Sequence, residues 1–540
     1  MKDTIVKYSD LSGYSKIFLD FNYNRENLSG IFGASKPGCL IKQINNSFYP
    51  RKELTDMLLR QNKGWNAPEK VINNIGKLGD EKSVVVTAGQ QACLFGGPYL
   101  VLLKMLTVLK KAKLLQTKYN IHVIPLFWIA SDDHDFTEIS QAHLFDTGGE
   151  IARLAIDYDK NRKYPPVGSL AFDDSVSREI NQLKNYLPEN DFKETAISSI
   201  EKYYSPGISI IDAFARYWLE LLGHQGLVLF NPYDAEVKEL CAPFMAGVID
   251  KRADLKKILS ESNEYLISRG YQLQVQKPES STHLFAHLPE RTAIHRIGNK
   301  FEAGKVKYSP ERLYGEIRAN PFNFSPDVFM RPLMQSYLFP VLDIIAGPSE
   351  IAYLAQMMPL FKLYDLPQPE ITARLSATLV EKKFENMMTS FDLQYQDIVL
   401  DFKKQLEEYV KEDFPDSISR QIDSIKKSNK EMLLELGEIS DRYSFDSKNI
   451  IEKYRRKLDY LTGELGKKLK GAHATQYGLH KNKFERMRKA LWPHESPPER
   501  SIALLYFISR YGKHVIDFID KKLDINPAGH QLIYLSEHHG

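Results

Sequence analysis

A strand, a glycine loop, a helix and a second strand follow one another early in the chain, and this order limits the fold more than any other feature. The strand at residues 84–86 leads into a polar loop at 87–91 and a glycine turn at 96–98. A long helical stretch then precedes an apolar run that ends in the acidic residues 131–135. This is the order of a βαβ unit, whose loops present polar groups at the carboxyl edge of a parallel sheet, where ligands bind. We expect the chemistry in this segment.

Apolar runs alternate with helical patterns from about residue 81 to 380, which is typical of a parallel sheet with helices on both faces. The expected strands are residues 84–86, 123–130, 226–231 and 341–346. Two stretches interrupt this order. Residues 146–220 are polar and are expected to be helical, whereas residues 270–318 contain apolar runs around a Gly298-Asn299 turn, which predicts a β-hairpin. The sequence therefore predicts an α/β core over residues 1–385 with two inserted segments.

Residues 386–485 have a different composition, rich in charge and poor in Gly and Pro, as in long exposed helices. An apolar stripe at 3,4 spacing is formed by Ile451, Tyr454, Leu458, Leu461 and Leu465. We expect an α-helical coiled-coil hairpin that turns near residues 443–447 and joins two copies of the chain as a homodimer. The alternative is that the stripe packs only on its own core. Residues 486–540 are expected to return to the core.

Charge and cysteine content exclude several classes of protein. The formal net charge is only +3, from 72 basic and 69 acidic side chains, so no strong field favours nucleic acid or an anionic membrane. Cys39, Cys93 and Cys241 are far apart, which suits a reducing compartment and offers neither a disulfide framework nor a CxxC zinc pair. The chain begins without a signal-peptide profile, and no apolar run is long enough to span a bilayer. A soluble cytoplasmic protein without nucleic-acid or membrane partners is the expectation.

The glycine turn is the first candidate binding site. Gly96 and Gly97 precede a helix, so free N–H groups there would lie at the positive end of the helix dipole, which favours phosphate or carboxylate. Gln90 and Gln91 add amide groups, and Lys104 follows two turns along the helix. The loop matches neither GxGxxG nor GxxxxGK[ST]. The alternative interpretation is a helix start selected for tight packing.

The acidic end of the second strand is more specific. Asp132, Asp133, His134 and Asp135 would repel and desolvate one another unless a ligand, a metal or a cation compensated them. His134 could act as a general acid or base near neutral pH, while Asp133 or Asp135 could orient its ring or hold a substrate ammonium. A divalent metal has no second group of ligands in sequence reach. The alternative is a solvated cluster that caps the helix after it.

A third group of candidates follows the strand at 341–346. Ser349 and Glu350 would lie at a helix N-terminus at the same sheet edge, and Arg331 could pair with a carboxylate, either on a substrate or on Glu350. The alternative for Arg331 is a structural ion pair. The stretch at 372–378 could cover the pocket as a loop or be an ordinary linker. The candidate binding residues are Gly89, Gln90, Gln91, Gly96, Gly97, Tyr99, Lys104, Ser131, Asp132, Asn231, Arg331, Gln335, Gly347, Ser349, Glu350, Tyr353, Arg374 and Ser376.

These motifs, in this order, resemble the bacillithiol biosynthesis cysteine-adding enzyme family (BshC). The resemblance covers essentially the whole chain and rests on four segments: 87–98, 127–136, 331–335 and 345–350. It implies a Rossmann-like core related to class I aminoacyl-tRNA synthetases and nucleotidylyltransferases, two connecting-peptide insertions and a coiled coil used for dimerisation. It also implies a reaction in which cysteine is joined through an amide to the glucosamine nitrogen of glucosaminyl-malate.

Amide formation needs an activated carboxylate, so we expect ATP, or its product ADP or AMP, as a further ligand. The sequence has neither HIGH nor KMSKS, and residues 96–99 and 374–378 are the positional candidates for those roles. The scattered cysteines argue against a zinc site that selects the cysteine thiol. Two other functions remain open: a nucleotidylyltransferase-like enzyme acting on another small acid, and a non-catalytic nucleotide-binding scaffold built around the coiled coil.

Overall fold

A computed structural model describes the chain except for residues 1–3, 34–36, 158–163, 403, 406–413, 445, 528 and 539–540. Contacts within it define two compact units: Met1–Glu381 together with Glu495–Gly540, and Lys382–His494. No helix of the described part of the chain combines the length and the apolar character that a membrane crossing requires.

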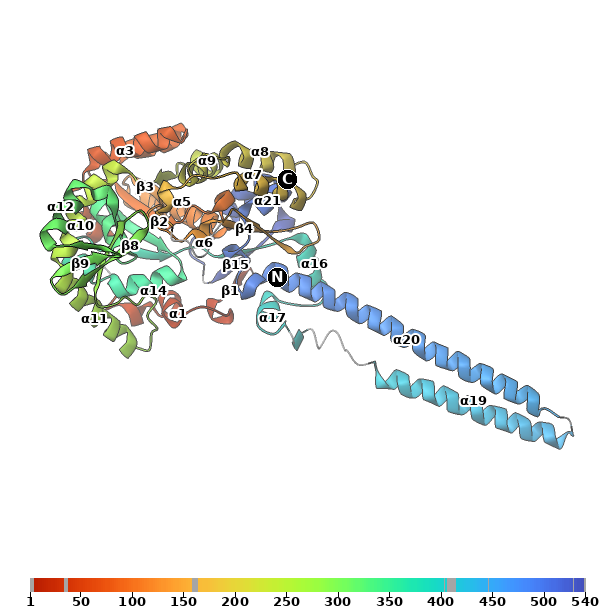
Figure 1. Cartoon of the computed structure of the whole chain (residues 1–540). Coiled ribbons are helices and arrows are strands. Elements are labelled where there is room, and N and C mark those ends of the chain that lie inside the picture. The colour runs from red at the N-terminus through yellow and green to blue at the C-terminus, as the bar shows by residue number, and fades with distance from the viewer. Residues whose placement is uncertain are drawn as a thin grey trace. The chain divides into compact units, whose positions relative to one another are not determined.

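The first unit is built on a five-stranded parallel sheet with the strand order β13-β12-β2-β3-β6. Figure 1 labels two of these strands, β2 and β3. The strands are β2 (Val84–Gln90), β3 (Val123–Ile129), β6 (Val228–Phe230), β12 (Val341–Ala346) and β13 (Glu370–Ala373). The prediction of a Rossmann-like parallel sheet is therefore confirmed, and three of the four expected runs contain β3, β6 and β12. The fourth, residues 84–86, is only the first part of β2, which continues through residues 87–90 that were expected to be a loop. The strands are almost wholly buried, which explains why they are uniformly apolar rather than alternating.

The strand order reverses its direction between β12 and β2. From β2 the chain passes through α5 (Leu100–Tyr119) to β3 on one side, whereas from β12 it passes through α14 (Pro348–Met357) to β13 on the other side. Right-handed crossovers of opposite direction require these two helices to cover opposite faces of the sheet. A crevice opens at such a reversal, outside the carboxyl ends of the two strands. The loops after β2 and β12 are therefore the first place to look for a ligand site.

The remaining helices of the first unit surround the sheet. They are α1 (Lys16–Tyr23), α2 (Pro37–Asn45), α3 (Arg51–Gly64), α4 (Glu69–Lys77), α6 (Phe136–Ile139), α7 (Ser175–Tyr186), α8 (Lys193–Tyr203), α9 (Ile210–Leu222), α10 (Ala235–Asp250), α11 (Arg252–Ser268), α12 (Pro310–Ala319), α13 (Met330–Leu338), α15 (Leu360–Leu363), α21 (Leu504–Tyr511) and α22 (Val515–Lys522). The helices expected within residues 146–220 are α7, α8 and α9. The antiparallel hairpin of β4 (Gln141–Phe145) and β5 (Ile151–Ala155), which precedes them, was not expected from the sequence.

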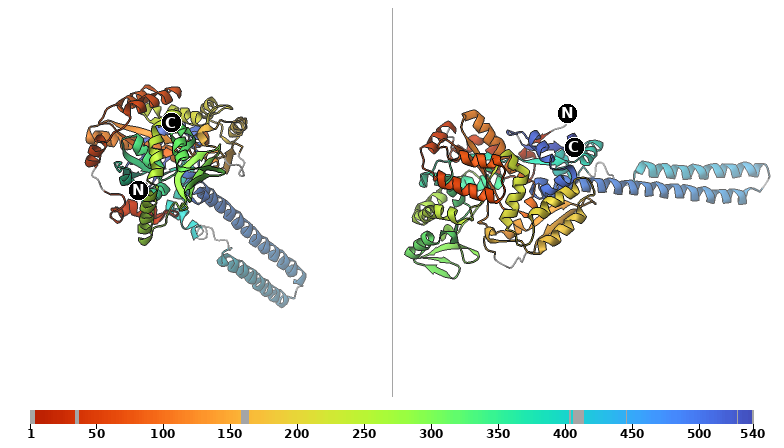
Figure 2. Two further views of the ribbon diagram at one scale, coloured as in Figure 1. Left: turned by 60° about the vertical axis from the view of Figure 1, so that its left-hand side comes forward. Right: turned by 90° about the horizontal axis from the view of Figure 1, so that it is seen from above.

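The second inserted segment, predicted at residues 270–318, forms most of a separate sheet, drawn in green in Figure 2. Its antiparallel order is β10-β9-β8-β7-β11. The strands are β7 (Ser281–His287), β8 (Arg291–Ile297), β9 (Lys300–Ala303), β10 (Val306–Tyr308) and β11 (Phe324–Pro326). The predicted hairpin is confirmed as β8 and β9, with Gly298 in the left-handed region at φ 60° in the turn.

A third, small sheet unites the two ends of the chain with the segment that follows β13. In it β15 (His530–Tyr534) pairs in parallel with β14 (Ala377–Val380) and antiparallel with β1 (Ile5–Val6). Residues 372–378, for which a loop over the pocket or an ordinary linker was expected, instead begin at the end of β13 and end in the buried strand β14.

The second unit contains two long antiparallel helices, α19 (Asp416–Arg442) and α20 (Lys448–Leu491), which lie side by side in Figures 1 and 2. The shorter helices α16 (Lys382–Ser390) and α17 (Tyr395–Val399) precede them. The predicted turn is present, and Asp446 accepts a hydrogen bond of 3.1 Å from the backbone N–H of Lys448 at the start of α20. Phe445, which belongs to the predicted turn, lies outside the described residues.

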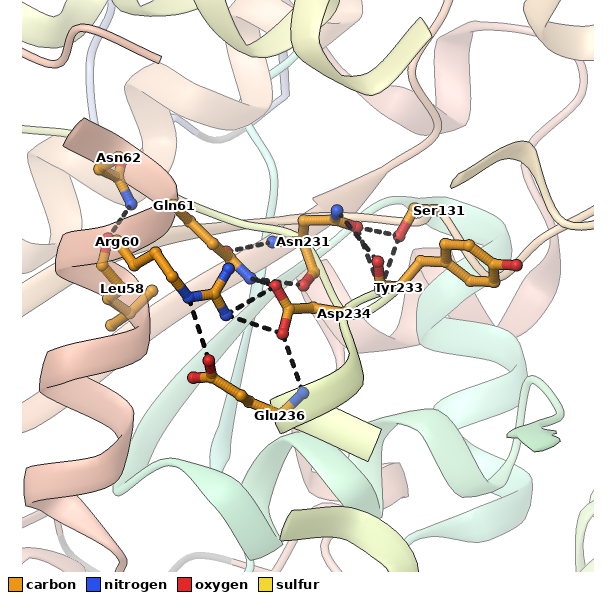
Figure 3. A network of polar contacts seen from close by, with 9 residues as sticks. All are labelled: Leu58, Arg60, Gln61, Asn62, Ser131, Asn231, Tyr233, Asp234 and Glu236. Carbon is orange, nitrogen blue, oxygen red and sulfur yellow. Dashed lines mark hydrogen bonds and ion pairs between the residues drawn. The ribbon is translucent and has the colours of Figure 1, made fainter. Parts of the chain in front are cut away.

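Two amide side chains of α3 take the place of a strand beside β6, whose other side pairs with β3. Asn62 Nδ2 donates to the carbonyl of Leu229 at 2.8 Å, and Asn62 Oδ1 accepts from the N–H of Leu229 at 3.3 Å. Gln61 makes the same two-way contact with the backbone of Asn231, at 3.0 Å in each direction (Figure 3). Because residues 229 and 231 present their backbone groups on the same side of the strand, the two amides satisfy groups that would otherwise be unpaired.

We expect Asn62→Ala to lower the free energy of unfolding by about 2 to 4 kcal/mol, because it leaves the buried N–H and C=O of Leu229 without partners. Chemical denaturation of the variant and the parent measures this difference. Asn73→Ala, at an exposed position of α4, is the matched control and should stay within about 0.5 kcal/mol of the parent. Equal midpoints for the two variants would show that the amide pairing contributes nothing.

Candidate functional site

A cavity of about 650 Å³ opens where the strand order reverses, at the carboxyl ends of β2, β3 and β12. Its walls come from the loops after these strands, from α5, α13 and α14, and from the inserted sheet. The lining residues are Gly89, Gln90, Gln91, Leu100, Lys104, Trp128, Ala130, Asp132, Asp133, His134, Glu138, Lys277, Phe285, Arg291, Pro326, Asp327, Val328, Arg331, Gly347, Pro348, Ser349, Glu350, Arg374 and Arg500. Twelve of the candidates from the sequence are in this set.

Lys104 joins the two strand ends at the floor of the cavity. It is only 3% exposed, and its ammonium donates to the carbonyl of Gly89 at 2.8 Å and to Gln90 Oε1 at 2.9 Å. The same nitrogen lies 2.8 Å from Glu350 Oε2. Burial lowers the pKa of Lys104, although the charge of Glu350 opposes that shift. Since an ammonium has three N–H donors, Lys104 has none left for a substrate carboxylate.

Glu350 also stabilises the start of α14. Its carboxylate accepts the backbone N–H of Gly347 at 2.7 Å, as in a capping box. A Cβ at Gly347 would lie 3.2 Å from Glu350 Oε2 and 3.4 Å from Arg374 Nε, so a glycine lets both charged side chains approach this loop. Burial raises the pKa of Glu350, but Lys104 and the Gly347 N–H outweigh burial and lower it overall.

The strand end of β3 carries a polar cluster around Asp133. Asp133 Oδ1 accepts the backbone N–H of His134 at 2.8 Å and lies 3.6 Å from the Arg291 guanidinium, while Oδ2 accepts from Gln91 Nε2 at 3.0 Å. Burial raises the pKa of Asp133, but the hydrogen bonds from His134 and the charge of Arg291 outweigh it, so that the pKa is well below its usual range. Asp133 is therefore ionised at neutral pH.

Arg291 reaches this cluster from the inserted sheet. Its guanidinium donates to Ser325 Oγ at 3.1 Å and to the carbonyl of Pro326 at 2.8 Å, and it lies 3.8 Å from the centre of the Phe285 ring. These contacts hold a cation beside Asp133 and His134.

His134 Nδ1 lies between two groups of opposite hydrogen-bonding character. It is 3.4 Å from Asp133 Oδ1 and 3.3 Å from the Arg291 guanidinium. With a proton on Nδ1 the ring can donate to Asp133 and leave Nε2 as an acceptor; without that proton Nδ1 can accept from Arg291. The His134 side chain is 42% exposed, so the ring is open to a ligand as well. This arrangement suits a residue that takes up and releases a proton.

Two further carboxylates on this side of the cavity have defined partners. Asp132 Oδ1 lies 2.6 Å from the ammonium of Lys238, a fully buried residue of α10 that also donates to the carbonyl of Phe324. Glu138 accepts from Gln90 Nε2 at 2.9 Å. Burial and the neighbouring charges of Asp135 and Asp133 raise the pKa of Glu138.

Arg331 and Arg500 are the lining cations with the fewest protein contacts among the described residues. Arg331 donates to Tyr353 Oη at 3.2 Å, which uses one of the guanidinium's N–H donors. Arg500 is exposed at the cavity wall. By contrast, Arg374 lies 2.7 Å from Glu499, and Lys277 lies 3.7 Å from Asp327. Arg331 and Arg500 are thus the groups most open to an anionic ligand.

The glycine turn is placed differently from the sequence-based expectation. Gly96 and Gly97 are buried outside the cavity lining; the Gly96 N–H donates to Tyr204 Oη at 2.9 Å and the Gly97 N–H to the carbonyl of Leu94 at 3.0 Å. A Cβ at Gly96 would lie 2.5 Å from the ring of Tyr217. Protein atoms thus occupy the amides that we expected to bind an anion, and the packing alternative describes this turn. Tyr99 is also buried, and its hydroxyl donates to the carbonyl of Ala377.

Ser131 and Asn231 belong to the network of Figure 3 rather than to the cavity wall. Ser131 Oγ donates to Asn231 Oδ1 at 2.5 Å, and both side chains accept the backbone N–H of Tyr233. Arg60 and Asp234 complete this network with contacts of 2.9 Å. These residues fix the loops after β3 and β6.

The other candidates outside the lining have local roles. Asp135 caps α6 by accepting the Glu138 N–H at 3.3 Å, as the capping alternative predicts. Gln335 is buried on α13, Tyr353 accepts from Arg331, and Ser376 lies in a buried network behind Arg374.

Arg291, Lys277, Phe285, Asp327 and Arg500 line the cavity but were not selected from the sequence. Lys277, Phe285 and Arg291 lie within the predicted insertion, and the only available signal was that a hairpin there could shape a pocket. Nothing in the local pattern around Arg500 indicates its position. Among the described residues no three His, Cys, Asp or Glu side chains gather in a way that could hold a metal ion.

Comparison with known proteins gives matches over nearly the whole chain. The N-terminal Rossmann-like domain of bacillithiol biosynthesis BshC matches residues 1–375, and the C-terminal coiled-coil domain of bacillithiol biosynthesis BshC matches residues 377–535. A relative from Bacillus cytotoxicus named "Putative cysteine ligase BshC" is 28% identical over 483 residues, 88% of this chain and 89% of its own length. A relative of the same name from Geobacillus thermodenitrificans is 30% identical over 513 residues, 90% of this chain and 91% of its own.

We expect Lys104→Met to lower the free energy of unfolding by about 3 kcal/mol, because it leaves the carboxylate of Glu350 without its cation in a largely buried position. Adding Glu350→Gln should recover part of that loss, since the uncompensated charge is removed. Lys113→Met, at an exposed position of α5, controls for the change of side chain. A double variant less stable than Lys104→Met alone would contradict the pairing.

Proposed function

The chain belongs to the bacillithiol biosynthesis BshC family, and from this premise we propose that it is a cytoplasmic ligase that joins L-cysteine to the amine of glucosaminyl-malate through an amide bond. The family membership rests on the two matches that together cover residues 1–375 and 377–535. The reaction is supported by the names of the relatives, which call them cysteine ligases, and by the chemistry of the cavity.

The observation that carries the proposal is the Asp133, His134 and Arg291 cluster at the carboxyl edge of the sheet. Forming an amide from an amine requires a group that removes a proton as the nitrogen attacks a carbonyl carbon. In the proposed reaction His134 is that base: Asp133 accepts from Nδ1–H and leaves the Nε2 lone pair to take the proton. The carboxylate then stabilises the imidazolium that forms.

The cysteine carboxylate must first be activated, and we propose that ATP does this. Transfer of the adenylyl group to the carboxylate oxygen releases diphosphate; the amine of the acceptor then attacks the carbonyl carbon, AMP leaves with the electron pair of the broken C–O bond, and the amine proton passes to His134. Alternatively, transfer of the γ-phosphoryl group of ATP to the carboxylate oxygen would release ADP and form an acyl phosphate, from which the attacking amine would displace phosphate. The lining groups that suit phosphate or carboxylate oxygens are Arg331, Arg500 and the start of α14 at Ser349.

The acceptor carries two malate carboxylates, and we assign one of them to Arg331 rather than to Lys104. Arg331 keeps most of its donors for a ligand, whereas the three donors of Lys104 are used by Gly89, Gln90 and Glu350. A guanidinium can bind a carboxylate through two parallel hydrogen bonds.

We expect His134→Gln to lower the rate of product formation by about 10² to 10⁴-fold while the fold is kept, which is the range for loss of an acid or base. Purified parent and variant are incubated with L-cysteine, glucosaminyl-malate and ATP, and the amide product is measured by mass spectrometry. His122→Gln, half-exposed just before β3 and at the opposite edge of the sheet, is the matched control and should keep the parent's rate.

An unchanged rate for His134→Gln would remove the imidazole from the mechanism. Absence of the amide product with the parent chain, for every nucleoside triphosphate tried, would contradict the proposed function itself.

We also propose that the coiled-coil unit joins two copies of the chain. The seam between α19 and α20 is close where glycines occur: a Cβ at Gly437 or at Gly466 would lie 3.4 Å from an isoleucine methyl group of the facing helix. Apolar side chains nevertheless remain well exposed on both helices, and a second copy would cover them. They include Met432, Leu436, Ile439, Tyr454, Leu461 and Leu465.

Replacing Leu461 and Leu465, which are 54% and 46% exposed, by glutamate should convert a dimer into a monomer, because charges would have to be buried in the interface. Static light scattering measures the mass. The control variant Lys453→Glu/Lys457→Glu changes exposed charged positions of the same helix. A mass that does not change in the leucine variant would mean that the stripe takes no part in dimerisation.

A further inference from the structure

A buried chain of hydrogen bonds connects the cavity with the C-terminal strand. Arg374, at the cavity wall, lies 2.7 Å from Glu499 Oε1. Glu499 Oε1 also accepts from Ser376 Oγ at 2.9 Å, and Ser376 Oγ lies 2.7 Å from His530 Nδ1. His530 Nε2 lies 2.8 Å from Thr378 Oγ1. All five side chains are buried.

The chemistry of these groups decides which of them donates in each hydrogen bond of the series. The Glu499 carboxylate can only accept hydrogen bonds. The Ser376 hydroxyl therefore donates its proton to Glu499 and must accept from His530. His530 then carries its proton on Nδ1, and Nε2 accepts from the Thr378 hydroxyl. Burial lowers the pKa of His530 to about 4, so the ring is neutral at pH 7, as this arrangement requires.

Glu499 cannot be replaced by its amide without loss. Oε1 accepts from both Arg374 and Ser376, and Oε2 accepts the backbone N–H of Ala377 at 2.8 Å. A glutamine would set its NH₂ group against a donor in either orientation. The network therefore requires Glu499 to be a carboxylate, and this carboxylate holds the Arg374 guanidinium in position.

Arg374 presents its guanidinium beside the start of α14. The described contacts use one N–H on the carbonyl of Leu375 and one on Glu499, and Gly347 leaves room for the Nε end. Ser349 and Arg500 line the same cavity. Two guanidinium groups and a helix N-terminus are a favourable setting for the oxygens of an anion.

We propose that Arg374 and Arg500 bind an anionic oxygen group of the substrate, a carboxylate or a phosphate, and that Glu499, Ser376 and His530 are positioning residues that hold Arg374 for this contact. The identity of the substrate in this inference rests on the proposed function, whereas the binding of the anion can be measured without any ligase activity. It makes the C-terminal strand β15 part of the site, although none of its residues lines the cavity.

Isothermal titration calorimetry of the full chain with inorganic phosphate, and separately with L-malate, tests the anion contact. The parent is expected to bind at least one probe, and the probe whose binding is weakened by Arg374→Gln and Arg500→Gln identifies the group as phosphate or carboxylate. Arg374→Gln should weaken that binding by about tenfold and Arg500→Gln by about threefold. Because Arg500 is exposed, its variant folds even if Arg374→Gln does not. Glu261→Gln, at an exposed position of α11, should bind as the parent does.

The positioning role is tested at the far end of the network. Thr378→Val removes the hydroxyl that donates to His530 and should weaken probe binding, whereas Thr378→Ser keeps the hydroxyl and should restore it. In the ligase assay Ser376→Ala should raise the KM of the anionic substrate and leave kcat nearly unchanged, which a mere loss of folded protein would not do.

Binding of both probes by Arg374→Gln and Arg500→Gln as tightly as by the parent would overturn the inference, and so would a parent that binds neither probe. If Thr378→Val and Thr378→Ser bind alike, the positioning role is overturned. If the chain lacks ligase activity but the calorimetric differences between the variants remain, the proposed function is wrong and this inference stands. If ligase activity is normal but those differences are absent, this inference is wrong and the proposed function stands.

Discussion

The site depends on one largely buried ion pair, between Lys104 of α5 and Glu350 of α14. Since α5 and α14 follow the two strands at which the sheet reverses its direction, a contact between them closes the floor of the crevice. The ammonium also holds the carbonyl of Gly89, and the carboxylate also holds the N–H of Gly347. Both strand ends are therefore fixed by the same two charges. Because Lys104 and Glu350 pair with each other, neither takes up the charge of Asp133 or Arg331 above this floor. Those two groups can therefore face a ligand.

The parallel sheet could be predicted because its strands are buried on both faces and read as apolar runs. The hairpin of β8 and β9 could be predicted because Gly298-Asn299 is a turn signal between such runs. The hairpin of β4 and β5 was missed although the turn signal Gly148-Gly149 lies between its strands, because the polar composition of residues 146–220 favoured helices there. The pairing of β15 with β14 joins segments far apart in sequence, and no local pattern encodes it.

The candidate site was predicted where chemistry follows a strand directly, as at Asp133, His134 and Glu350. It failed at Gly96 and Gly97, because a glycine indicates only that something approaches the backbone closely; here that partner is the side chain of Tyr217 or Cys93 and not a phosphate. Arg291 could not be found, since its place over the strand end depends on how the inserted sheet packs. These losses share one cause: local sequence predicts elements, and long-range packing decides which side chains meet.

The amides of Gln61 and Asn62 have a consequence for how the sheet is assembled. They lie more than 160 residues before the strand that they pair with, so during synthesis the partner of β6 leaves the ribosome first. When β6 emerges, its outer side meets two side chains of its own chain rather than a strand of another molecule. An exposed strand edge is a template for aggregation, and here that edge is closed by a helix of the same chain. The α3 helix thus prevents the outer side of β6 from pairing with a strand of another molecule.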